Sequence, residues 1–263
     1  MTARVIAIAN QKGGVGKTTT VVNLAAGLAE LGRRVLIVDL DPQGNATMGS
    51  GIGKQSLERS VYQVLLGDAT VEEARQPAKE GGYDVLPANR DLGGAELELV
   101  NELAREARLK NALVAVENDY DYVLIDCPPS LNLLTLNGLV AASSVLIPMV
   151  CEYYALEGLS DLVTTLRKVR AVVNPRIEIM GLLRTMFDAR SNLSQQVAEQ
   201  LARHFGNKVL DTVVPRNVRL AEAPSHGLPG LIYDRTSRGA QAYLALAQEL
   251  VSRMEPATET PSV

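Results

Sequence analysis

The sequence contains no tryptophan and only two phenylalanines among its 263 residues. The core must therefore be built from aliphatic side chains, and hydrophobic residues make up 46% of the chain. No apolar run approaches the roughly 18 residues that a membrane-spanning helix needs. Cysteine is also scarce, since Cys127 and Cys151 are the only two. No secretory signal precedes the first apolar segment, so we expect a protein of the reducing cytoplasm that is not bound to a membrane.

The chain has little net charge, −4 at pH 7, which disfavours a general polyanion binder. The charge is unevenly distributed, however. Residues 176–238 contain nine Lys and Arg against six Asp and Glu, a net charge of +3, so the remainder carries −7. A basic segment on an acidic body favours a localised anionic partner.

One glycine-rich stretch, N-Q-K-G-G-V-G-K-T-T-T at residues 10–20, stands between an apolar run at 5–9 and a helical pattern at 21–29. Strand, glycine-rich loop and helix together predict a phosphate-binding loop, in which backbone N–H groups and the helix N-terminus face the anion. We expect Lys17 to reach the β- and γ-phosphates and the Thr18 hydroxyl to ligate Mg²⁺. The residues predicted to bind ATP here are Lys12, Gly13, Gly14, Val15, Gly16, Lys17, Thr18 and Thr19.

The loop departs from the usual phosphate-loop pattern at its start, where Gln11 stands in place of glycine and Lys12 follows it. One interpretation is that Lys12 is a solvated surface charge. The form K-G-G-x-G-K-T, however, resembles the deviant Walker A motif of the ParA/MinD ATPase family. In that family the early lysine reaches the nucleotide of a partner subunit and stabilises charge in the transition state. The resemblance therefore implies a catalytic role for Lys12 beside Lys17.

Two further apolar segments end in acidic residues. Residues 34–39 lead into Asp39-Leu40-Asp41, and residues 122–126 end at Asp126, which two prolines soon follow. A buried strand ending in aspartate is typical of a Walker B element, so we expect Asp126 to hold Mg²⁺ opposite Thr18 and Asp39 to lie near the same metal. By resemblance, Asp41 orients the attacking water. The alternative is that Asp39 and Asp41 only end a strand and cap a turn.

Five motifs in order carry the resemblance across nearly the whole chain, and they match the short chromosomal Soj-like group of ParA partition ATPases. They are N-Q-K-G-G-V-G-K-T-T-T, V-D-L-D-P-Q-G-N-A-T, I-D-C-P-P-S, C-E-Y-Y-A-L-E-G-L and P-R-N-V-R-L-A-E-A-P-S. The last motif implies that Pro215 packs on adenine and Asn217 reads its edge. Arg190 and Arg219 match positions at which the family binds DNA, and Arg216 is a further candidate from its charge, although surface salt bridges are an equal alternative for such arginines.

The resemblance also implies a function, a chromosome- or plasmid-partitioning ATPase with ATP and Mg²⁺ as cofactors. Its expected partners are a second copy bound through ATP, non-specific nucleoid DNA, and a ParB-type centromere-binding protein that stimulates hydrolysis. Such a protein is cytoplasmic and nucleoid-associated.

The order of segments predicts an α/β fold of the P-loop NTPase type, in three layers, with a doubly wound and mostly parallel sheet. Ligands of such sheets bind at the carboxyl ends of the strands. Helical periodicity over 92–118 predicts two helices with a break near 105–109. We expect a single ATPase domain over residues 1–254 and a flexible polar tail over 255–263.

Two other functions share the deviant loop. A MinD-like membrane-cycling ATPase needs a basic amphipathic C-terminal helix, whereas residues 254–263 are acidic and interrupted by proline. A redox protein like nitrogenase iron protein needs two cysteines per subunit to bridge a cluster. Cys127 lies inside the Walker B turn, which leaves only Cys151 for that purpose.

Overall fold

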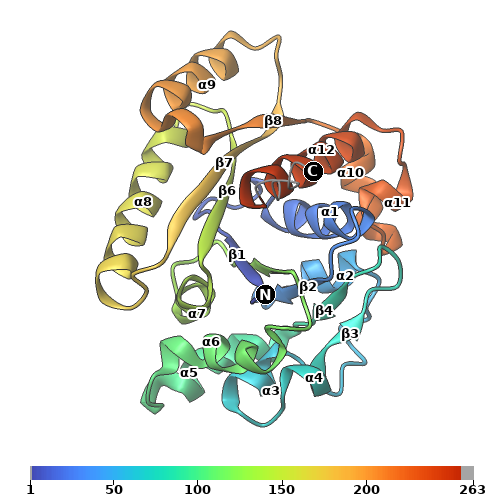
Figure 1. Ribbon diagram of the computed structural model, residues 1–263, viewed down its shortest axis with the longest axis vertical. Helices are drawn as coiled ribbons and strands as arrows, with labels where there is room; N and C mark the ends of the chain where they lie inside the picture. The colour runs from blue at the N-terminus through green and yellow to red at the C-terminus, as the bar shows by residue number, and fades with distance from the viewer. Residues whose placement is uncertain (1, 256–263) are drawn as a thin grey trace, which may run out of the picture.

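The computed structural model describes residues 2–255, and its centre is one eight-stranded sheet (Figure 1). The strand order is β3-β4-β2-β5-β1-β6-β7-β8, and all neighbours are parallel except β3 and β4. The strands are β1 Arg4–Ile8, β2 Val35–Asp39, β3 Gln76–Pro77, β4 Asp84–Leu86, β5 Tyr122–Asp126, β6 Ser144–Val150, β7 Glu178–Phe187 and β8 Val209–Pro215. The predicted mostly parallel α/β fold is confirmed.

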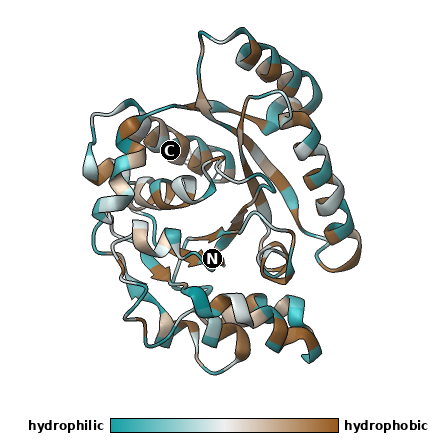
Figure 2. Cartoon of the chain, turned by 180° about the vertical axis from the view of Figure 1, so that it is seen from behind, coloured by the Kyte–Doolittle hydropathy of each residue, from teal (hydrophilic) through white to brown (hydrophobic). Residues whose placement is uncertain are grey.

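Helices cover both faces of the sheet, and each face has its own hydrophobic cluster. The α-helices are α1 Lys17–Glu30, α2 Asn45–Gly49, α3 Val61–Leu66, α4 Val71–Ala74, α5 Ala95–Glu98, α6 Arg108–Leu113, α7 Leu133–Ala141, α8 Ala155–Val172, α9 Asn192–Phe205, α10 Val218–Glu222, α11 Gly230–Tyr233 and α12 Arg238–Met254. Short 3₁₀ turns are η1 Arg90–Gly94, η2 Leu99–Asn101, η3 Arg105–Ala107, η4 Val114–Val116, η5 Gly206–Lys208 and η6 Ala223–His226. In Figure 2 the outer helices alternate between hydrophobic and hydrophilic colour, as helices with one buried side should.

The packing of the helices follows from their sequences. Helix α1 is built largely from alanine, valine and leucine, and it packs against α12 closely enough that a Cβ at Gly27 would lie 3.0 Å from Ala247 Cβ. Helices α7, α8 and α9 contribute to the cluster on the opposite face. Among residues 2–255, no helix combines the length and apolarity that crossing a bilayer requires.

The parallel register brings the ends of the central strands together. Asp39 at the end of β2 is the partner of Asp126 at the end of β5, and Ile8 at the end of β1 is the partner of Asp126 on its other side. The loop that leads into α1 therefore begins beside two buried carboxylates. This edge of the sheet is where the predicted site lies.

Residues 92–118 differ from the two predicted helices. They form six short helical segments, of which α6 is the longest. In chain order these are η1, α5, η2, η3, α6 and η4. Ala104 has φ 51°, a left-handed conformation that a continuing helix cannot contain. The apolar periodicity correctly marks buried positions, since Leu99, Leu109 and Leu113 are buried. It does not require that the helix be continuous.

The predicted tail, residues 255–263, lies outside the described residues except for Glu255. Its carboxylate accepts hydrogen bonds from Arg33 Nη2 at 2.6 Å and from the Tyr122 hydroxyl at 2.7 Å, so Glu255 is anchored to the fold. All eight strands belong to one sheet, as a single domain over residues 1–254 requires, and that boundary stays a prediction.

Candidate nucleotide-binding site

The glycine-rich loop joins β1 to α1 and opens toward solvent. Gly14 and Gly16 have φ angles of 72° and 87°, which favour glycine because a Cβ would be strained there. Gly16 is the N-cap of α1, and as a glycine it has no side chain to cap the first turn of this helix. The free N–H groups of the first turn can therefore bind an anion.

Lys17 begins α1 and is held in the loop, with 8% of its surface exposed. Its ammonium donates to the Lys12 carbonyl at 3.1 Å. Burial lowers the pKa of Lys17, whereas the neighbouring charge of Asp126 raises it. A phosphate group could supply the anion that this buried ammonium lacks.

Thr18 and Asp126 meet directly, because the Thr18 hydroxyl donates to Asp126 Oδ2 at 2.7 Å. The second carboxylate oxygen, Oδ1, is buried and has no hydrogen-bond partner among residues 2–255. Burial, and after it the charge of Asp39, raises the pKa of Asp126 well above its ordinary range. A hard cation such as Mg²⁺ prefers oxygen ligands of this kind, so the residues present fit the predicted metal.

Asp39 lies next to Asp126 in the sheet, but its carboxylate is directed into its own loop. Oδ1 accepts from the Asp41 amide at 3.1 Å, and Oδ2 accepts from the Thr47 amide at 2.9 Å and the Thr47 hydroxyl at 2.8 Å. Burial raises the pKa of Asp39 to about 6, despite the opposing hydrogen bonds from Thr47. A role near Mg²⁺ stays a prediction for Asp39, whose observed contacts fix the backbone.

Asp41 is half-buried and lies close enough to Lys17 for the two charges to interact. Its Oδ1 accepts from the Gln43 amide at 2.9 Å, which is the turn-capping bond of the alternative interpretation. Asp41 is also among the charges that raise the pKa of Lys17. Asp41 therefore lies near the phosphate loop, and a turn cap through Oδ1 is compatible with the catalytic role.

The Lys12 side chain extends toward the start of α8. Its Cε would lie 3.5 Å from a Cβ at Gly158, and its ammonium lies 5.9 Å from the centre of the Tyr154 ring. Tyr153 and Tyr154 are exposed by 74% and 63% and stack edge to face. Lys12 thus lies on an exposed aromatic surface, from which it could extend toward another molecule.

The residues predicted to contact adenine and those predicted to contact DNA do not form one cluster. Asn217 Oδ1 caps α10 by accepting from the Arg219 and Leu220 amides, so only its amide nitrogen is left to contact a base. Arg216 lines a cavity of about 220 Å³ together with Lys12, Gly13 and Glu152, close to the phosphate loop.

Arg190 and Arg219, the two arginines that match DNA-binding positions, are in ion pairs. Arg190 pairs with Asp188 at 3.0 Å, and Arg219 pairs with Glu222 at 2.9 Å. Both pairs are at the surface, where such contacts contribute little and are weakened by salt. The pairs therefore do not prevent phosphate binding.

Two residues of the site were not expected. Thr47 holds Asp39, and Asn10 ties the loop to β6 by donating to the Pro148 carbonyl at 2.8 Å and accepting from the Lys12 amide at 3.0 Å. Both residues lie within the motifs quoted from the sequence. Small polar side chains near glycines or after a turn often bond to nearby backbone groups, so these two positions could have been predicted to make such loop contacts.

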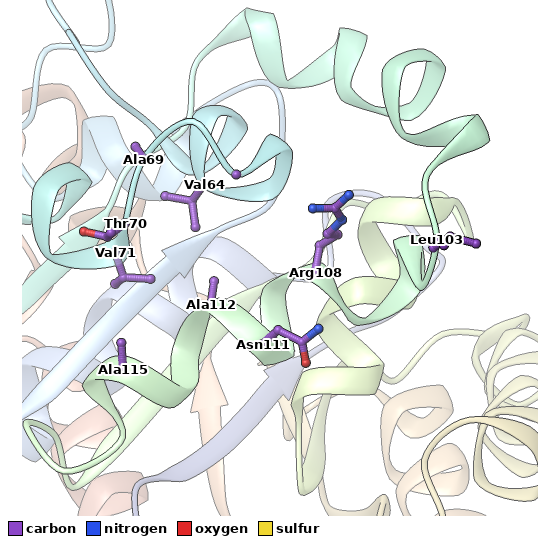
Figure 3. Close-up of a pocket in the computed structure, with 10 residues that line it drawn as sticks. Val64, Ala69, Thr70, Val71, Leu103, Arg108, Asn111, Ala112 and Ala115 are labelled. Atoms are coloured by element: carbon purple, nitrogen blue, oxygen red, sulfur yellow. The ribbon is translucent and has the colours of Figure 1, made fainter.

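A second cavity, of about 360 Å³, adjoins the phosphate loop at Thr18 and Thr19, and a further one lies away from it. Figure 3 shows this further cavity, of about 520 Å³, with Arg108 and Asn111 on one side and Val64, Val71 and Ala112 among its apolar walls. Its lining contains no residue of the phosphate loop. Because this cavity does not adjoin the acidic ends of β2 and β5, it is not the site of the chemistry.

Comparison with known proteins agrees with this geometry. The sequence model of a family described as "AAA domain" matches residues 3–179. The sporulation initiation inhibitor protein Soj of Bacillus subtilis is 57% identical over 249 residues, which cover 95% of this chain and 98% of that protein. The chain belongs to the ParA/MinD family of ATPases. Another ParA/MinD relative, the chromosome partitioning protein ParA of Caulobacter vibrioides, is 53% identical over 252 residues, 95% of this chain and 94% of that protein.

A solved structure extends the ParA/MinD comparison to the nucleotide. A Mycobacterium smegmatis protein named cobyrinic acid a,c-diamide synthase, with a bound ATP analogue and magnesium, has a TM-score of 0.85 and 41% identity, and the match covers 99% of both chains. This chain therefore shares the predicted P-loop fold, over almost its full length, with a protein that binds an ATP analogue and Mg²⁺.

Proposed function

We propose that the protein is a chromosome- or plasmid-partitioning ATPase that depends on ATP and Mg²⁺. The observation that carries this proposal is the meeting of Lys17, Thr18 and Asp126 at the carboxyl ends of β1 and β5. The names of the Soj and ParA relatives, at 57% and 53% identity, support the partitioning role.

Each residue of the site has a role that follows from its position. The loop amides and Lys17 bind the phosphates, and Thr18 and Asp126 would hold Mg²⁺, which neutralises charge on the phosphates when bound. Asp41 orients the attacking water from the mouth of the site. Adenine packs on Pro215, and the free amide nitrogen of Asn217 donates to its edge.

Lys12 makes the site depend on a second copy of the chain. Its ammonium lies 5.9 Å from the ring of the exposed Tyr154, so it can move to a partner's nucleotide without breaking a buried contact. ATP then favours the dimer because only the dimer offers this added cation to the triphosphate.

The dimer in turn controls DNA binding. Arg190 and Arg219 contact phosphates of non-specific DNA, and two copies bound together bring twice as many cations to one duplex. Arg216 stays a DNA candidate, although it lies beside Lys12. A ParB-type partner stimulates hydrolysis, the dimer separates, and the protein leaves the nucleoid.

DNA co-sedimentation with ATP, ADP or no nucleotide tests this proposal. We expect retention on random-sequence DNA with Mg-ATP only, with a steep loss as salt is raised. Equal retention in all three conditions would contradict the coupling of nucleotide to DNA.

The name of the M. smegmatis relative gives a second candidate, an ATP-dependent amide-forming synthase. Turnover that requires an acid substrate and an amide donor, and that DNA and a centromere-binding protein do not change, would favour it. A MinD-like membrane cycle is less well supported, because α12 buries its apolar face with Tyr243, Leu246 and Leu250.

A further inference from the structure

One buried carboxylate holds both ends of the loop that carries Asp41. We define the Asp41 loop as residues 40–46, from the end of β2 into the first turn of α2. Asp39 Oδ1 accepts from the Asp41 amide at one end of the loop, and Asp39 Oδ2 accepts from the Thr47 amide and hydroxyl at the other. The position of the loop therefore depends on where the Asp39 carboxylate lies.

Thr47 determines where that carboxylate lies. Its side chain is fully buried, and its hydroxyl accepts from the Ala88 amide at 2.9 Å while donating to Asp39 at 2.8 Å. A hydroxyl has one proton to donate, so the direction of the bond to Asp39 is fixed. The neighbouring Gly44 packs on the same segment, because a Cβ there would lie 2.7 Å from the Ala88 carbonyl oxygen. The Asp41 loop is thus tied to the segment that follows β4.

We infer that Thr47 is a positioning residue for ATP hydrolysis, which acts through Asp39 to hold Asp41 at the phosphate loop. The inference rests on the proposed role of Asp41 in orienting water. Thr47 itself does not line the cavity beside Lys12 and Gly13 and acts at a distance from the reacting atoms. Loss of its hydroxyl should slow the chemical step and leave nucleotide binding intact.

Two substitutions separate the hydroxyl from the volume of the side chain. Thr47→Val keeps the shape but removes both the donor to Asp39 and the acceptor of the Ala88 amide. Thr47→Ser keeps the hydroxyl but loses a methyl group. Because hydrogen bonds to charged groups are the stronger ones, we expect Thr47→Val to lower kcat by about tenfold to a hundredfold with KM for ATP within about twofold. Thr47→Ser should stay within about threefold of the wild-type kcat.

Amide hydrogen exchange of the nucleotide-free protein gives a readout that does not depend on turnover. We expect exchange at the Asp41 amide to rise about tenfold or more in Thr47→Val, with the phosphate-loop amides unchanged. Val169→Ala, a cavity variant of the buried face of α8, controls for general destabilisation and should leave Asp41 exchange unchanged. If Thr47→Val does not fold, Thr47→Ala removes the same hydroxyl.

The outcomes distinguish the inference from the proposed function. Wild-type kcat and Asp41 exchange in Thr47→Val would overturn the positioning role. Faster exchange of the Asp41 amide together with a wild-type kcat would also overturn it, because the position of the loop would then not limit hydrolysis. Normal turnover in Asp41→Ala would instead remove the proposed role of Asp41 itself. A loss of kcat in Thr47→Ser equal to that in Thr47→Val would assign the effect to packing.

Discussion

Replacing the buried Asp39 with asparagine should remove a pH-dependent loss of stability from the nucleotide-free protein. Burial raises the pKa of Asp39 from its ordinary 3.8 to about 6. The folded state therefore holds a proton that the unfolded state releases between these two values, and folding stability falls as pH rises through this window. A shift of that size corresponds to about 3 kcal/mol, at about 1.4 kcal/mol per pKa unit.

Urea denaturation from about pH 3.5 to 8, with EDTA and without nucleotide, measures this effect. The chain has no tryptophan, so circular dichroism is the suitable signal. The lost hydrogen bonds of Asp39→Asn give an offset that does not change with pH, so the quantity to follow is the difference between wild type and variant. We expect wild-type stability to fall relative to the variant by about 3 kcal/mol or more as pH rises through and beyond the window, because the charge of Asp39 also raises the pKa of Asp126. A difference that is flat with pH would refute the reasoning, because Asp39 would then titrate alike in both states.

Three other substitutions test the rest of the site. Lys12→Ala should abolish ATP-dependent dimerisation while a fluorescent ATP analogue still binds, because Lys17 and the loop remain; unchanged dimerisation by light scattering would refute a role in trans. Asp126→Asn should raise stability near pH 7 in thermal unfolding, because burial raises the pKa of Asp126 and so disfavours the folded state above the ordinary pKa of the carboxyl, and lower Mg²⁺-dependent turnover by at least about a hundredfold. Arg219→Glu should weaken DNA binding and reduce its salt dependence, with ATP binding kept; Arg203→Glu, on the exposed side of α9, is the matched control and should change DNA binding less.

The fold could be predicted from the sequence because its signals are local. Continuous apolar segments ending at Asp39 and Asp126 identify buried parallel strands, and the glycine-rich loop between strand and helix identifies the phosphate-binding end. The meeting of Thr18 with Asp126 follows, since parallel strands place their carboxyl ends at one edge. The DNA and partner residues stay predictions.

The remaining features depend on contacts between distant segments. The sequence suggested that Asp39 lies near a metal, and could not show that its carboxylate is engaged by Asp41 and Thr47, a few residues further on. The bond from Ala88 to Thr47 joins residues 41 positions apart, and no local pattern marks it. The breaks within 92–118 also arise from tertiary packing, which determines where an apolar periodicity becomes continuous helix and where it becomes turns.

The account depends most on ATP joining two copies of the chain, and light scattering of Asp41→Ala in saturating Mg-ATP tests this directly. The account predicts a stable dimer of about twice the 28.2 kDa chain mass with ATP, and a monomer with ADP. A variant that binds ATP, fails to hydrolyse it and still remains a monomer would contradict the account.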